Sequence, residues 1–256
     1  MSDVVRVEVA GGVAVVTVDN PPVNAIGEPT LEGLEEAARQ IAGDDEVRAV
    51  VLTGAGEKAF MAGADLREFE RMLEEGQGID EHTAATRRIF GLWERLPQPV
   101  VAAVQAPALG GGLEAALVCD LIVADPAARF GFPEVRLGLI PGAGGTQRLP
   151  RRIGVGAAKE LLLLGGSVDA QEAQRLGLVN RVSAPGQALE ESRGLAARLA
   201  ALPAVAVRAA KRAVDIEIGA GLDREHALFL EAFASEDVRE GVRAFVEKRA
   251  PRFGHR

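Results

Sequence analysis

The sequence has little cysteine and few aromatic residues: one cysteine, one tryptophan, nine phenylalanines and no tyrosine among 256 residues. A single cysteine excludes a disulfide framework within the chain. No apolar run reaches the ~18 residues that a membrane-spanning helix needs. The N-terminal segment has neither a basic n-region nor an apolar h-region, so no signal peptide is expected. These absences predict a cytoplasmic protein with no membrane partner.

Basic residues are outnumbered by acidic ones. Lys and Arg total 29 against 37 for Asp and Glu, which gives a formal net charge of −8. Proteins that bind nucleic acids normally carry a basic field, and aromatic residues at 4 % leave little surface for stacking on bases. We therefore expect no nucleic-acid partner.

Metal-binding and nucleophilic motifs are also missing. The histidines, His82, His226 and His255, are scattered, and the sequence has no HExxH motif or paired CxxC motifs, so no metal site is expected. The GxSxG nucleophile elbow is absent as well. Cys119 lies in an apolar run and is interpreted as a small buried hydrophobic residue.

The hydrophobic pattern changes in character along the chain. In the first half, strands are predicted over residues 4–9, 13–19, 47–53, 100–104 and 121–124. Helices are predicted there over residues 30–42, capped by Thr30, and over 66–75, 82–96 and 110–119. From about residue 144, helices are predicted over 147–153, 155–164, 170–176, 189–202, 205–218, 222–234 and 237–248. This order indicates an α/β core followed by a helical region.

Residues 54–59 match the GxGxxG/A pattern of dinucleotide-binding turns and follow a predicted strand. Such a site needs a helix that begins at the second glycine, so that its free N–H groups meet the pyrophosphate. Here the next helix is expected to begin only near Asp65. We therefore interpret the segment as a turn that ends a strand, with a nicotinamide-dependent dehydrogenase as the alternative.

The clearest candidates for a catalytic site are three glycine-rich segments, residues 60–66, 108–114 and 130–148. Glycine lets a substrate approach the backbone closely, and the helix start expected in the second segment favours a developing anion. Glu114 and Glu134 lie near these glycines among apolar neighbours. Taken singly, each is more often structural, but burial and mutual repulsion raise carboxylate pKa values toward neutrality. As a pair they are a candidate acid and base.

These segments and four flanking motifs resemble the crotonase superfamily of enoyl-CoA hydratases and isomerases over nearly the whole chain. The flanking motifs are NPPVNA at residues 20–25, VVAAV at 100–104, an AxxxGLV stretch within 169–182, and FVEKRAPRF at 245–253. The resemblance implies an α/β fold of the ClpP/crotonase type, a spiral of ββα units with two roughly perpendicular sheets and a helical C-terminal region. It implies that residues 1–195 form the spiral core with the acyl-CoA site. Residues 196–256 would form an oligomerisation region for a homotrimer or a dimer of trimers.

The resemblance also implies roles for individual residues. Ala64 and Gly111 match the two positions whose backbone N–H groups form an oxyanion hole for the thioester oxygen. Glu114 and Glu134 match the two acid/base positions of the hydratases, whereas relatives that only shift a double bond commonly keep one. Contacts with CoA and substrate are implied for Ala25, Ala62, Gly63, Asp65, Leu66, Gly110, Pro133, Gly142 and Lys248.

The implied reaction is the reversible addition of water to a trans-2-enoyl-CoA, which gives a 3-hydroxyacyl-CoA in β-oxidation or related acyl-CoA metabolism. No cofactor or metal is expected, because CoA is part of the substrate. Met61 and Leu113 depart from the family, which usually has small residues there, and they bear on acyl preference. Two alternatives are an isomerase or other acyl-CoA enzyme on the same scaffold, and a non-catalytic RNA-binding relative.

Overall fold

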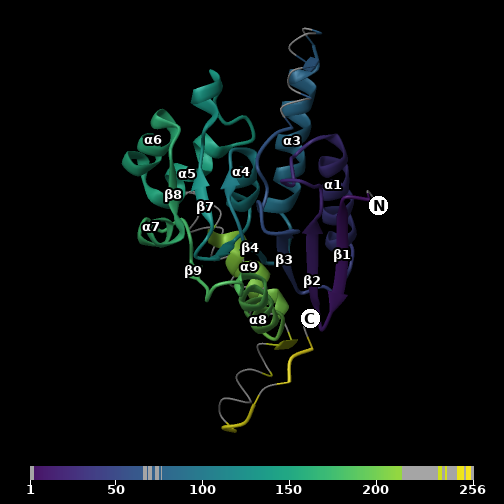
Figure 1. Cartoon of the computed structure of the whole chain (residues 1–256). Helices are drawn as coiled ribbons and strands as arrows, with labels where there is room; N and C mark the ends of the chain where they lie inside the picture. Colours follow the sequence, from purple (N-terminus) through teal and green to yellow (C-terminus); the bar gives the residue numbers. More distant parts are fainter. Residues whose placement is uncertain are drawn as a thin grey trace.

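The computed structural model describes residues 3–65, 68, 71–72, 75, 77–214, 236–237, 240, 247–250 and 252–254. Its strands are β1 (Val5–Ala10), β2 (Val13–Val18), β3 (Ala49–Gly54), β4 (Val100–Val104), β5 (Ala108–Leu109), β6 (Leu121–Ala124), β7 (Arg129–Gly131), β8 (Ser167–Asp169) and β9 (Arg181–Val182). They form a six-stranded sheet with the order β1–β2–β3–β4–β6–β9 and a three-stranded sheet with the order β5–β7–β8 (Figure 1). The predicted α/β architecture with two sheets is confirmed.

The helices follow the predicted change in pattern, with more strands first and more helices later. They are α1 (Glu28–Ala42), α3 (Ile79–Glu94), α4 (Gly111–Leu117), α5 (Gly145–Ile153), α6 (Val155–Leu164), α7 (Ala170–Arg175), α8 (Ala188–Ala200) and α9 (Ala204–Val214), with a 3-10 helix η1 (Glu134–Leu137). Figure 1 shows α1 and α3 beside the first strands and α5, α6 and α7 beside the small sheet.

The large sheet begins with a hairpin and continues as a parallel sheet. Gly11 and Gly12 connect β1 to β2 with φ of 58° and 79°, values that a type I′ hairpin turn requires and that glycine adopts freely. From β2 onward each neighbouring pair is parallel. Parallel strands covered on both faces are apolar throughout, which is why β3 and β4 could be predicted from uninterrupted apolar runs.

Alternate residues of the central strands enter two different hydrophobic layers. Val50 and Leu52 of β3 pack in the main core together with Trp93 of α3. Val51, between them, packs on the other face of the sheet with Leu195 and other residues of α8. The sheet is therefore buried on both sides, and the main core lies on the side that carries α1, α3 and α4.

The start of α1 differs from the prediction. The helix begins at Glu28, two residues before Thr30, with Gly27 at the N-cap and Pro29 in the first turn. Thr30 is buried inside the helix, and its hydroxyl donates to the Ala25 carbonyl at 2.9 Å. Proline is well suited to the first helical turn because it needs no N–H partner there, so the expected Thr30 cap was wrong.

The glycine pattern at residues 54–59 ends β3 without starting a helix. Residues 55–65, all of which the structure describes, contain no helix. The buried Asn24 side chain instead donates through Nδ2 to the carbonyls of Ala55, Ala59 and Phe60 at 2.9, 3.0 and 3.2 Å. These contacts fix the segment as a turn, as predicted, and leave no helix N-terminus for a pyrophosphate.

The C-terminal part of the chain is described only in pieces. α9 covers the first part of the helix predicted over residues 205–218, and Lys211 ties it to the large sheet through an ion pair with Asp120 at 2.8 Å. The helix predicted over 222–234 and most of the one over 237–248 lie outside the described residues. The division of the chain at residue 195 stays a prediction. Within the described segments, no helix is long and apolar enough to cross a membrane.

Candidate active site

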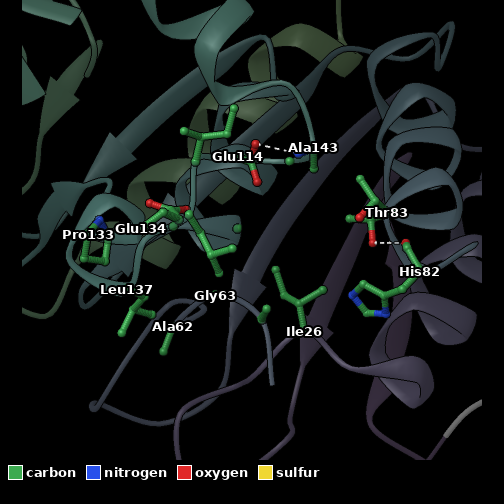
Figure 2. Close-up of a pocket in the computed structure, with 17 residues that line it drawn as sticks. Ile26, Ala62, Gly63, His82, Thr83, Glu114, Pro133, Glu134, Leu137 and Ala143 are labelled. Atoms are coloured by element: carbon green, nitrogen blue, oxygen red, sulfur yellow. Dashed lines mark hydrogen bonds between the residues drawn. The ribbon is translucent and has the colours of Figure 1, made fainter. Parts of the chain in front are cut away.

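The three glycine-rich segments meet at one cavity of about 210 Å³ (Figure 2). The small sheet brings them together, because β5 precedes α4 and pairs with β7, which leads to Pro133 and η1. A single bridge between Met61 and Ala108 joins the first segment to β5. The predicted site residues that line the cavity are Ala62, Gly63, Ala64, Gly110, Gly111, Glu114, Pro133, Glu134 and Gly142.

The first turn of α4 lies so close to the first glycine-rich segment that side chains would not fit between them. Gly110, the N-cap, has a φ of 54°, a conformation that glycine adopts without strain. A Cβ on Gly112 would lie 1.8 Å from the carbonyl oxygen of Met61. Glycine at these positions lets the start of α4 contact the first glycine-rich segment backbone to backbone.

This close approach places two backbone amides side by side. A Cβ built on Gly111 would lie 3.7 Å from the amide nitrogen of Ala64, and one built on Gly63 would lie 3.5 Å from the amide nitrogen of Gly111. Neither amide donates to a backbone carbonyl of the described residues. Two such donors on one cavity wall can stabilise an oxygen that gains negative charge.

Glu114 is a buried carboxylate with a fixed orientation. Its side chain enters the cavity from the first turn of α4, and the residue is only 3 % exposed. One oxygen, Oε1, accepts from the amides of Ala143 and Gly145 at 2.8 and 2.7 Å. Burial raises the pKa of Glu114 above its usual value, and these two amides and the Arg148 charge oppose that rise.

Glu134 is the more perturbed of the two carboxylates. It opens η1 and lies against the start of α4, where a Cβ on Gly110 would lie 2.8 Å from its Oε1. Its Oε2 is buried and has no hydrogen-bond partner among the described residues. Burial, together with the Glu114 charge, raises the pKa of Glu134 to about 7. The pair therefore has one carboxyl group that holds a proton near neutral pH, as an acid requires.

The raised pKa of Glu134 predicts a pH dependence of stability. An unfolded Glu has a pKa of about 4.3, so between that pH and about 7 the folded protein binds a proton that the unfolded chain releases. Stability therefore falls as pH rises through this window, because unfolding releases that proton and a higher pH favours its release. We expect the wild type to lose more unfolding free energy than Glu134→Gln between about pH 5 and about pH 8, measured by urea denaturation.

The comparison of the wild type with Glu134→Gln isolates the contribution of Glu134 to the pH dependence of stability. Glu114 titrates in both and contributes a slope of the same sign in each, because burial also raises its pKa. Equal pH slopes in wild type and Glu134→Gln would contradict a folded-state pKa near 7 for Glu134.

The cavity has a second wall that motif analysis did not find. α3 supplies His82, Thr83 and Thr86 to the lining. His82 and Thr83 lie across the cavity from the two carboxylates (Figure 2). Ile26, Ala143 and three rim residues, Leu137, Leu139 and Ile140, complete the lining. These three apolar rim residues are exposed, and exposed apolar residues that cluster indicate a contact surface. The sequence alone does not show that exposure, so it gave no signal for this wall.

Some predicted contacts do not line this cavity. The Ala25 carbonyl accepts hydrogen bonds from the Asn20 and Thr30 side chains. The Asp65 amide donates to the Ile26 carbonyl at 3.3 Å. Lys248 is exposed and does not line the cavity. Leu66 lies outside the described residues, so the CoA-contact roles expected of these four residues remain predictions.

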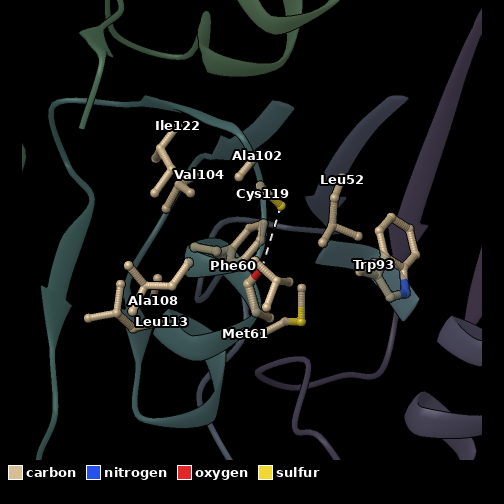
Figure 3. Packing of buried hydrophobic residues seen from close by; sticks show 14 of the residues in the cluster. Leu52, Phe60, Met61, Trp93, Ala102, Val104, Ala108, Leu113, Cys119 and Ile122 are labelled. Atoms are coloured by element: carbon tan, nitrogen blue, oxygen red, sulfur yellow. Dashed lines mark hydrogen bonds between the residues drawn. The ribbon is translucent and has the colours of Figure 1, made fainter. Parts of the chain in front are cut away.

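Met61 and Leu113 were expected to bear on acyl preference. Both are fully buried and belong to the main hydrophobic core, where they pack with Phe60 (Figure 3). Neither lines the cavity. Their size is therefore accommodated by core packing, and the cavity walls come from other residues.

In the described part of the chain, no cluster of three or more His, Cys, Asp and Glu side chains could hold a metal ion. The cavity instead combines two adjacent amide donors, a carboxylate fixed by two hydrogen bonds and a second carboxyl with a raised pKa. This combination suits enzymes that stabilise an enolate oxygen while protons move at the neighbouring carbons.

Comparison with known proteins identifies the family of this enzyme class. The model of the enoyl-CoA hydratase/isomerase family matches residues 8–256. A short-chain-enoyl-CoA hydratase from Clostridium acetobutylicum is 42 % identical over 251 residues, 96 % of this chain and 95 % of that protein. A crotonyl-CoA hydratase from Syntrophomonas wolfei is 39 % identical over 245 residues, 94 % of each chain.

Solved structures agree with the sequence relatives. The crystal structure of an enoyl-CoA hydratase from Bacillus anthracis superposes with a TM-score of 0.94 at 39 % identity, covering 99 % of this chain and 100 % of that one. The chain belongs to the enoyl-CoA hydratase/isomerase family, and the predicted crotonase fold is confirmed.

Proposed function

We propose that the protein is an enoyl-CoA hydratase, which adds water reversibly to a trans-2-enoyl-CoA and yields a 3-hydroxyacyl-CoA. One observation carries the proposal: Glu114 and Glu134 line the same cavity as the adjacent amides of Ala64 and Gly111. Addition of water benefits from two acid/base groups, because one proton leaves the water and another reaches carbon. Relatives named hydratases at about 40 % identity support the assignment.

In the proposed reaction, the amides of Ala64 and Gly111 form the oxyanion hole and hold the thioester oxygen. As water attacks C3, charge collects on that oxygen, where each donor contributes about 3–4 kcal/mol of transition-state stabilisation. Glu114 orients the water and accepts its proton. The protonated Glu134 then delivers a proton to C2 as the enolate collapses, which completes the addition of water across the double bond.

The remaining predicted residues fit this proposal as substrate contacts. Ala62 and Gly63 line the cavity beside the amide pair, and Gly110, Pro133 and Gly142 line it elsewhere. In the family resemblance, the stretch that begins at Ala62 also receives the adenine of CoA. The reaction requires no redox cofactor or metal, since the thioester already activates the double bond and CoA arrives with the substrate.

The wider setting is also part of the proposal. A role in β-oxidation or related acyl-CoA metabolism, in the cytoplasm, fits the substrate class. Assembly as a homotrimer or a dimer of trimers through residues 196–256 is proposed from the family resemblance.

The proposal is tested by following the conjugated enoyl-thioester absorbance of crotonyl-CoA with the wild-type protein. Hydration removes the conjugation, so we expect a rapid enzyme-dependent loss of absorbance. A folded protein that binds CoA thioesters but leaves crotonyl-CoA unchanged would contradict a short-chain hydratase. A gain of absorbance from a 3-enoyl-CoA without any hydration would indicate the isomerase, and salt-dependent RNA binding without either activity would indicate the RNA-binding relative.

A further inference from the structure

Arg148 on α5 connects the α3 wall of the cavity to the loop that holds Glu114. Its guanidinium donates through Nε and Nη2 to the two carboxylate oxygens of Glu94, the last residue of α3, at 2.7 and 2.8 Å. The third group, Nη1, donates to the Ala143 carbonyl at 2.8 Å. The planar arginine is thus held at all three of its corners, and its side chain is 19 % exposed. This geometry fixes an arginine more firmly than a single contact would.

The loop that Arg148 holds is the one that orients Glu114. Ala143 and Gly145 supply the two amides that bond Glu114 Oε1, and the carbonyl bonded by Arg148 belongs to Ala143 itself. The peptide before Ala143 therefore donates its N–H to Glu114, and the peptide after it accepts through its carbonyl from Arg148. A shift of Arg148 would turn the peptides whose N–H groups fix the carboxylate.

Packing against the core also holds this loop. A Cβ on Gly145 would lie 2.7 Å from the ring of the buried Phe132, so the backbone there fits tightly against the core. Gly144, at a φ of 108°, makes the turn into α5, and its carbonyl accepts the amide of Arg148 at 2.9 Å. The loop is therefore held both by packing against Phe132 and by the hydrogen bonds of Arg148.

We propose that Glu94 and Arg148 are a positioning pair that holds the Ala143 carbonyl and thereby aims the Glu114 carboxylate at the substrate. The pair contacts neither the reacting carbons nor the oxyanion amides. The inference rests on the proposed function, because it assigns Glu114 a catalytic task. It adds two residues that the sequence motifs did not single out.

The charges around Glu114 predict how each variant changes its titration. Glu134 on η1 adds a like charge to the cavity, and Arg148 on α5 adds an opposite one. Among the described residues, Glu94 and His82 of α3 are the other ionisable groups near Glu114, with Glu94 paired to Arg148 and His82 in the cavity wall. The charges of Arg95 and Arg151 also act on Glu94. Loss of the Arg148 charge should raise the pKa of Glu114, and loss of the Glu94 charge should lower it, because Arg148 is then unopposed.

The test compares Arg148→Gln, Arg148→Lys and Glu94→Gln with the wild type in crotonyl-CoA hydration. We expect kcat to fall on the order of 10- to 10²-fold in Arg148→Gln, the effect of a small misplacement at the reacting centre, with KM nearly unchanged. Arg148→Lys should recover part of kcat. The acid limb of the kcat/KM profile, which reports ionisation of Glu114, should move to higher pH in Arg148→Gln and to lower pH in Glu94→Gln.

Opposite shifts in pH distinguish positioning from a structural role. A structural ion pair would lower kcat and thermal stability without moving the acid limb in two directions, and that result would overturn the proposal. The matched control is Arg88→Gln, which removes an arginine of α3 that makes a bidentate pair with Glu35 and does not line the cavity. Its profile should match the wild type. A wild type without hydratase activity would refute the proposed function instead. If Arg148→Gln does not fold, the shift of the acid limb in Glu94→Gln still tests the proposal, because it must be to lower pH.

Discussion

Glu134→Gln is expected to hydrate crotonyl-CoA about 10²- to 10⁴-fold more slowly than the wild type, the range that a positioned proton donor contributes. Glutamine keeps the shape of the side chain but cannot deliver a proton to C2. The effect should fall on kcat, with little change in KM, because the variant leaves unchanged the amides of Ala64 and Gly111, which we propose hold the thioester. The measurement is the steady-state loss of enoyl-thioester absorbance.

The same variant should fold at least as well as the wild type. The Oε2 of Glu134 is buried and has no hydrogen-bond partner in the described part of the chain. A neutral amide avoids the burial of charge that raises the pKa of this carboxyl to about 7. Glu160→Gln, on the exposed surface of α6, is the control for loss of a carboxylate elsewhere. A Glu134→Gln enzyme with near wild-type kcat would show that another group supplies the proton.

Gly112→Ala is expected to reduce kcat about 10²- to 10³-fold, the loss seen when one oxyanion donor is removed. The new Cβ would lie 1.8 Å from the Met61 carbonyl oxygen, so the two backbones must separate. Met61 cannot retreat easily, since it is fully buried and bridges to Ala108. Separation would draw the amide of Gly111 away from that of Ala64. Overpacking of this kind also destabilises by about 1–3 kcal/mol.

Gly194→Ala is the matched control for this variant. Gly194 lies inside α8, and a Cβ there would meet nothing within 4 Å. Alanine in a helix interior is more stable than glycine by roughly 0.5–1 kcal/mol, so the control should melt at a higher temperature with unchanged activity. Activity and thermal unfolding of both variants measure the effect. Full activity in Gly112→Ala would contradict the need for close contact between α4 and the first glycine-rich segment.

The sequence was informative where a residue type and its surroundings disagreed. Glu114 stood out as a carboxylate inside an apolar run, and residues 110–112 stood out as consecutive glycines at an expected helix start. β3 and β4 were predictable because parallel strands buried on both faces are apolar throughout. These local contrasts singled out the carboxylates and the glycines of residues 110–112, whereas the pairing of the Ala64 and Gly111 amides came from the family resemblance.

Features set by long-range packing were not predictable in the same way. β5, β7 and β8 have two or three residues each, too few to show a period of two. Thr86 reads as one more residue of an amphipathic helix until α3 is placed beside the loop at Ala143. The contacts of Arg148 with Glu94 and Ala143 likewise depend on how α3, α4 and α5 meet.

The single bridge between Ile26 and Ala64 determines which amides of the first glycine-rich segment are paired and which one points away. Ile26 donates to the Gly63 carbonyl at 2.8 Å and accepts from the Asp65 amide at 3.3 Å. In a parallel ladder the residue between two such partners turns its own N–H away, and here that residue is Ala64. The register of this bridge therefore determines which amide is free to donate, independently of any side chain. This stretch should tolerate many substitutions, whereas one inserted or deleted residue would exchange the free amide for a bonded one.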